Sequence, residues 1–170
     1  MRNDDRGHEQ PTLVVTSPGF SPGGEIPAAH TCEGGDVSPE LRWSGVPNGA
    51  RSLALIVDDP DAPDPAAPQR TWVHWVVYDI PPDTSRLSED TRRHGLPRGA
   101  REGKNDWGKT GYGGPCPPSG RHRYVHKLYA LDCLLGERGP LSKAQLERAM
   151  AGHVLASAEL VGTYQKRGRR

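Results

Sequence analysis

Runs of β-branched and aromatic residues, separated by glycine and proline, dominate the hydrophobic pattern of this chain. Residues 52–59 (SLALIVDD) and 72–80 (WVHWVVYDI) are apolar on both faces, as is typical of strands buried between two layers. Residues 121–132 (RHRYVHKLYALD) predict a third long strand, and residues 12–16 and 41–43 predict two short ones. The pattern therefore favours a protein built mainly from β-sheet.

The C-terminal part of the chain carries one clear helical pattern. Ser142 followed by Gln145 is typical of a capping box at a helix N-terminus. The apolar residues that follow at helical spacing are Leu146, Ala149, Met150 and Val154. Residues 158–166 then return to β-forming types and predict a last strand that pairs back into a sheet.

This element content predicts a mainly β protein, as a two-layer β-sandwich or a mixed sheet covered on one side, with one late α-helix. Residues 81–120 are polar and rich in glycine, which predicts a long, site-forming loop. No repeat or linker divides the pattern. We therefore predict a flexible N-terminus over residues 1–11, a single domain over 12–165 and a basic tail over 166–170.

Composition excludes several classes of protein. The 21 glycines and 17 prolines exclude a helical bundle, because these residues cost about 1 and 3 kcal/mol each inside a helix. A net charge of +1 argues against nucleic acid as the main partner. The longest aliphatic run, residues 53–57, is far shorter than the roughly 20 residues that span a bilayer, and the first residues lack the apolar core of a secretory signal. We predict a cytoplasmic protein with no membrane span.

Three cysteines, Cys32, Cys116 and Cys133, are too few for a disulfide scaffold and lack the C-x-x-C spacing of a structural zinc site. Reduced thiols are the simplest expectation. A redox pair between Cys32 and Cys116 stays open as an alternative, because sequence spacing does not fix the distance between them.

Candidate binding chemistry gathers on the central strands. Strand periodicity puts Trp72 and His74 on one side of their strand, and His122 and Tyr124 on one side of theirs. Protonation of two imidazoles is favoured near an anion, and a carboxylate such as Asp59 can hold one ring in the tautomer that donates toward the ligand. These residues predict a receptor for a phosphate-like anion.

Two proline-containing segments would frame this receptor. The prolines of residues 59–63 (DPDAP) restrict the backbone and fix the direction of the acid that precedes them. Residues 111–120 mix glycines, which expose backbone N–H groups, with prolines, which lower the entropy lost on binding. We predict a preformed rim there.

Taken in their order along the chain, these segments resemble the two signature regions of the phosphatidylethanolamine-binding protein family. DPDAP at 59–63 with W-x-H-W at 72–75 resembles the first region, and residues 113–131 (GGPCPPSGRHRYVHKLYAL) resemble the second. Residues 30–43 (HTCEGGDVSPELRW) look like the bacterial and archaeal branch of Raf-kinase-inhibitor-like proteins. The resemblance runs from about Leu13 to Tyr164.

The resemblance implies a β-sandwich of one large and one small sheet, with a small anion-binding pocket at one end and a cis peptide bond at Asp59–Pro60. It implies no cofactor and no required metal. By position, the ligand-binding residues would be Asp59, Pro60, Asp61, Pro63, Trp72, His74, Gly114, Pro117, Pro118, His122 and Tyr124.

We therefore predict a binding protein rather than an enzyme, whose ligand is a phosphate-like anion or a phosphoethanolamine-type headgroup. Asp61 would face the ammonium group, and Trp72 would form an apolar wall. The family implies a kinase or protease as a protein partner, and its bacterial branch implies a homodimer.

Two enzymatic alternatives use the same histidines. His74, His122 and a carboxylate resemble a facial triad for a metal ion. Ser38, one of these histidines and Asp59 could form a hydrolase triad, although no G-x-S-x-G motif supports it. Packing or surface roles are expected for the other aromatic residues and histidines: His8, His30, His94, His126, His153, Trp43, Trp75, Trp107 and Tyr112.

Overall fold

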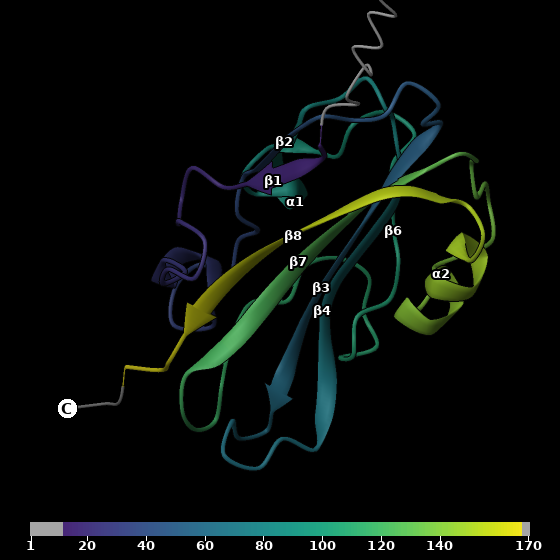
Figure 1. The fold of residues 1–170 in the computed structure, drawn as a ribbon. Helices are drawn as coiled ribbons and strands as arrows, with labels where there is room; N and C mark the ends of the chain where they lie inside the picture. Colours follow the sequence, from purple (N-terminus) through teal and green to yellow (C-terminus); the bar gives the residue numbers. More distant parts are fainter. Residues whose placement is uncertain (1–11, 168–170) are drawn as a thin grey trace, which may run out of the picture.

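A computed structural model describes residues 12–167, which form two antiparallel β-sheets (Figure 1). The large sheet has the strand order β6-β4-β3-β7-β8. Its strands are β3 (Ser52–Ala62), β4 (Arg70–Ile80), β6 (Arg101–Glu102), β7 (His122–Leu131) and β8 (Val154–Tyr164). The small sheet has the order β1-β2-β5, with β1 (Val14–Thr16), β2 (Leu41–Ser44) and β5 (Arg86–Leu87). The predicted mainly β fold with one large and one small sheet is confirmed.

Residues 12–167 also contain three short helices. They are η1 (Ala28–His30), α1 (Thr91–His94) and α2 (Lys143–Met150). Figure 1 shows β1, β2 and α1 on one side of the long strands and α2 on the other. No helix in residues 12–167 is both long and apolar enough to cross a membrane.

The large sheet is buried on both faces because a separate apolar core packs against each. One core joins the two sheets and includes Trp43 of β2, Leu55 of β3 and Trp75 of β4. The other lies under α2 and joins Ile56 of β3 to Leu146 of the helix. Alternate residues of β3 therefore enter different cores, which explains why this strand is apolar on both faces.

The capping box of α2 is confirmed. The backbone N–H of Gln145 donates to Ser142 Oγ at 3.2 Å, and the backbone N–H of Ser142 donates to Gln145 Oε1 at 3.0 Å. The helix ends at Met150, however, and the expected helical role of Val154 is wrong. The backbone leaves the helical conformation at Ala151, whose ψ is 125°, Gly152 follows with a positive φ of 82°, and Val154 pairs with Leu131 as the first residue of β8.

We expect Ser142→Ala to lower the free energy of unfolding by about 1 kcal/mol, because the helix loses its N-cap acceptor. Urea unfolding measures this change. Ser157→Ala, at an exposed position of β8, is the control and should change the free energy by less than about 0.5 kcal/mol. Equal effects of the two substitutions would contradict a capping role.

The predicted turn after the first central strand needs correction. β3 continues through Asp59 and Pro60 to Ala62, so the Asp59–Pro60 bond lies inside an extended strand. The expected cis bond there is wrong, and the cis bond among the described residues is Ala62–Pro63. Residues 81–120 hold only β5, α1 and β6, as expected for a long loop. The predictions for residues 1–11 and 168–170 lie outside the described residues.

Candidate ligand-binding site

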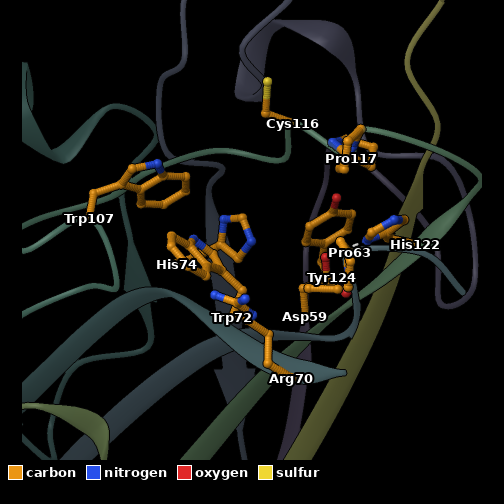
Figure 2. A pocket seen from close by; sticks show the side chains of 12 residues that line it. Asp59, Pro63, Arg70, Trp72, His74, Trp107, Cys116, Pro117, His122 and Tyr124 are labelled. Carbon is orange, nitrogen blue, oxygen red and sulfur yellow. Dashed lines mark hydrogen bonds and ion pairs between the residues drawn. The ribbon is translucent and has the colours of Figure 1, made fainter. Parts of the chain in front are cut away.

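A cavity of about 450 Å³ lies at the end of the large sheet where β7 begins (Figure 2). It is lined by Asp59, Ala62, Pro63, Arg70, Trp72, His74, Trp107, Cys116, Pro117, Pro118, His122 and Tyr124. The expected pairs come together because β4 and β7 both flank β3, and alternate residues of each strand face the same side. Asp59 of β3 pairs directly with Trp72 of β4, which brings the acid beside the aromatic wall.

His122 and Asp59 form a buried, proton-sharing pair. His122 Nδ1 lies 2.6 Å from Asp59 Oδ2, and His122 Nε2 lies 2.8 Å from the backbone oxygen of Ser119. A carbonyl oxygen only accepts, so Nε2 carries a hydrogen. Another proton lies between His122 Nδ1 and the Asp59 carboxylate. Burial raises the pKa of Asp59, and the hydrogen bond with His122 opposes this rise. The pair has no net charge, whichever atom holds the proton.

This arrangement corrects the expected role of His122. Both of its ring nitrogens are already hydrogen-bonded within the protein, so the ring has no free donor for a ligand. The ring lines the cavity and is stacked on Tyr124, with ring centroids 6.4 Å apart. His122 therefore shapes and positions the site rather than donating into it.

His74 is also buried, and it is neutral. Its Nδ1 lies 2.8 Å from the backbone oxygen of Gly113 and donates to it, which leaves Nε2 with a lone pair. Burial lowers the pKa of His74 to about 4. His74 therefore presents an acceptor to the cavity, and the expected gain of protonation near a bound anion stays a prediction.

Among the described residues that line the cavity, Tyr124 has a fully buried hydroxyl donor without a partner. Tyr124 is 1% exposed, and its hydroxyl oxygen has no hydrogen-bond partner among the described residues. Burial and the nearby Asp59 raise the pKa of Tyr124, so the hydroxyl keeps its proton. Figure 2 shows this hydroxyl pointing toward the loop that carries Pro117. A buried donor without an acceptor costs about 1–3 kcal/mol, so a ligand oxygen would be stabilised here.

Asp61, Pro60 and Gly114 do not line the cavity. Arg123 holds the Asp61 carboxylate with two guanidinium contacts of 3.0 and 2.8 Å, and this pairing lowers the pKa of Asp61. The expected contact of Asp61 with an ammonium group is therefore wrong. The pairing of β3 with β4 shifts register after Asp59, so simple alternation does not carry Asp61 onto the cavity face.

The local backbone geometry explains why Pro60 and Gly114 lie outside the cavity lining. Pro60 follows Asp59 in the strand, and its side chain therefore lies on the other face. The Gly114 N–H donates to Asp36 Oδ1 at 2.9 Å, and this glycine lines a second cavity of about 320 Å³.

Two polar or aromatic lining residues, Arg70 and Trp107, were not predicted from the sequence. Arg70 precedes Trp72 and His74 at a spacing of two in β4, so strand alternation alone could have placed it on the same face. Trp107 was expected to be a packing residue, but it is 44% exposed and its indole lies edge-on to His74 at 5.1 Å. No spacing signal points to Trp107, because it reaches the cavity from a long loop.

Cys116 belongs to the predicted rim over residues 111–120; it lines the cavity and forms a disulfide with Cys32, the alternative that the sequence left open. The expectation of reduced thiols is wrong for this pair. The Cys32 N–H also donates to the backbone oxygen of Pro115 at 3.1 Å. The bond ties the loop that carries Pro117 and Pro118 to the segment after η1. Disulfides are rare in cytosolic proteins, so this bond weighs against the predicted cytoplasmic location.

The geometry does not support the two enzymatic alternatives. Ser38 Oγ lies 3.3 Å from Thr91 Oγ1 and accepts from the Thr91 N–H, and Ser38 is not among the lining residues of the cavity. A facial metal triad would need a free nitrogen on His122, and both are engaged.

Comparison with known proteins gives a consistent result. Residues 16–165 match the family model described as phosphatidylethanolamine-binding protein. A UPF0098 protein of Methanothermobacter thermautotrophicus is 50% identical over 148 residues, which cover 86% of this chain and 95% of the relative.

Two solved structures share the fold closely. A phosphatidylethanolamine-binding protein homologue from Chlamydia trachomatis superposes with a TM-score of 0.83 at 44% identity, covering 92% of this chain and 99% of the other. Escherichia coli YbcL, described as a member of the mammalian family, gives a TM-score of 0.81 at 37% identity over 91% and 99% of the two chains.

Proposed function

The chain belongs to the phosphatidylethanolamine-binding protein family, and from this premise we propose that its cavity binds a phosphate-like anion carried by a small headgroup. The observation that carries the proposal is the buried Tyr124 hydroxyl, which has no partner in the described part of the chain. A phosphoryl oxygen would accept its hydrogen bond.

The charges and walls of the cavity support the same ligand class. Arg70 brings a guanidinium to the lining, and guanidinium groups bind phosphate well. His74 Nε2 is an acceptor, which suits the P–OH group of a monoprotonated phosphate. Trp72 and Trp107 lie edge to face at 5.5 Å and offer apolar surface to the substituent of the phosphate. Phosphoethanolamine, the headgroup in the family's name, fits this description.

We expect Tyr124→Phe to weaken binding of phosphoethanolamine about 10-fold or more, because a hydrogen bond to a charged group contributes about 1.5–3 kcal/mol. Isothermal titration calorimetry with phosphoethanolamine and with inorganic phosphate measures the loss and compares the two ligands. The unfolding free energy should not fall, since the substitution removes an unpaired buried hydroxyl.

Tyr129→Phe is the matched control, because Tyr129 lies on the same strand and packs against the core under α2. The affinity of the Tyr129→Phe variant for phosphoethanolamine should equal that of the unmodified protein. The proposal is wrong if neither ligand binds at millimolar concentration, or if both tyrosine variants bind equally well.

We also propose a binding role rather than catalysis. In the part of the chain that the structure describes, the cavity lining contains no serine, its cysteine is in a disulfide, and both nitrogens of His122 are engaged. The Raf-kinase-inhibitor-like resemblance predicts a kinase or protease partner, and we propose that such a partner contacts the rim formed by Pro117 and Pro118. Saturating phosphoethanolamine would then weaken the complex. A homodimer stays a prediction of the same resemblance.

A further inference from the structure

Three side chains with different metal-binding atoms gather at the far end of the large sheet from the cavity. Asp132 and Cys133 follow β7 directly, and His153 directly precedes β8. One ligand atom from each lies within 4.8 Å of the other two. β7 runs from His122 at the cavity to Leu131 beside this group, a strand length of roughly 30 Å. The group is therefore separate from the anion site.

Hydrogen bonds to the backbone of Asp132, Cys133 and His153 hold these three residues in place. The Asp132 N–H donates to the His153 backbone oxygen at 3.0 Å, which joins the two segments. The Ser52 hydroxyl donates to the Cys133 backbone oxygen at 2.6 Å, and the His153 N–H donates to the Met150 backbone oxygen at 2.9 Å. The ligand atoms thus come from a fixed frame, and only side-chain torsions are needed to adjust them.

A thiolate, an imidazole and a carboxylate are a ligand set that suits zinc. Tetrahedral bonds of about 2.0–2.3 Å to zinc would place the ligand atoms roughly 3.3–3.8 Å apart. Asp132 Oδ1 and His153 Nδ1 are 2.8 Å apart, and their side chains are 44% and 47% exposed, so both can rotate to open this contact. The distances from Cys133 Sγ to the other two ligand atoms are at most 4.8 Å, so reaching the spacing around zinc requires movements of about 1 Å. Three protein ligands would leave the fourth position to water.

A carboxylate among the three side chains favours a cation at this position, because Asp132 contributes a negative charge. We propose that Asp132, Cys133 and His153 bind a divalent transition-metal ion of the zinc type and thereby join the ends of β7 and β8.

Cobalt(II) tests the proposal, because a thiolate bound to cobalt gives a charge-transfer absorption that carboxylate and imidazole do not. The full chain, treated with a chelator and with its disulfide intact, is titrated with Co²⁺. We expect the band to appear and saturate at about one equivalent, and to vanish when Zn²⁺ is added. Cys133→Ser should abolish the band, and His153→Ala should weaken cobalt binding at least 10-fold.

His94→Ala is the control, because His94 is an exposed histidine of α1 outside the group. It should leave the titration unchanged, and circular dichroism checks that each variant is folded. His153 is exposed, so its replacement keeps the test informative even if the Cys133 variant folds poorly. The proposal is overturned if no thiolate band appears at stoichiometric cobalt, or if His153→Ala and His94→Ala bind cobalt equally well. Phosphoethanolamine affinity should be the same with and without zinc, so failure of either site leaves the other testable.

Discussion

Acidification from about pH 7 to about pH 4 is expected to remove about 6 kcal/mol of folding free energy, because two buried histidines stay neutral in the folded protein. His74 is 3% exposed and His126 is 2% exposed. Burial lowers the pKa of each from 6.5 to about 4. A difference of this size corresponds to about 3 kcal/mol for each residue.

The direction in which stability changes with pH follows from proton binding. Between pH 6.5 and about 4 the unfolded chain binds protons at both histidines, whereas the folded protein does not. Stability therefore rises with pH across this window and is lost as the pH falls through it. Asp59 acts in the opposite direction at the acid end, because burial raises its pKa and its protonation favours the folded state.

Urea unfolding at a series of pH values measures this loss. His126→Asn keeps a donor for the backbone oxygens of Tyr124 and Leu160 but removes one titrating group, so it should halve the pH dependence. His94→Asn, at an exposed position, should leave the dependence unchanged. A free energy of unfolding that stays constant from pH 6.5 to 4 would show that the buried histidines are not neutral in the folded state.

Loss of the Cys32–Cys116 disulfide is expected to lower the free energy of unfolding by about 4 kcal/mol. The two cysteines are 84 residues apart, and cross-linking so long a loop strongly restricts the unfolded chain. The bond also holds the loop that carries Pro117 and Pro118, so we expect weaker phosphoethanolamine binding as well. The double variant Cys32→Ser/Cys116→Ser tests both effects by urea unfolding and calorimetry.

Cys133→Ser is the control, since Cys133 is outside the disulfide and outside the cavity lining. Without added metal, it should retain the phosphoethanolamine affinity of the unmodified protein. A double variant with the stability and affinity of this control would show that the hydrogen bonds of the loop suffice to hold the rim.

Strand periodicity accounts for the part of the site that could be predicted from the sequence. His74 and Tyr124 line the cavity as expected, because the two-residue repeat of a strand survives when both faces are covered. Asp61 was placed in the site by the family resemblance, and a register shift after Asp59, which no residue pattern reveals, directs it away from the cavity.

Contacts between distant segments could not be predicted in this way. Trp107 reaches the cavity from a loop, and the partner of Cys32 is 84 residues away. The two-residue strands β5 and β6 are too short to leave a periodic pattern in the sequence. The hydrogen bond from His122 to Ser119 depends on the local path of a loop, which residue types alone do not determine.

The proton shared by His122 and Asp59 has a consequence for how the cavity selects anions. Since this pair is neutral overall and His74 is uncharged, the formal positive charge of the lining comes from Arg70. The lining itself therefore contributes to long-range attraction of an anion through one exposed guanidinium, and this contribution would be screened beyond about 8 Å at physiological ionic strength. Inside the cavity, recognition depends on the directions of hydrogen bonds rather than on a concentration of positive charge.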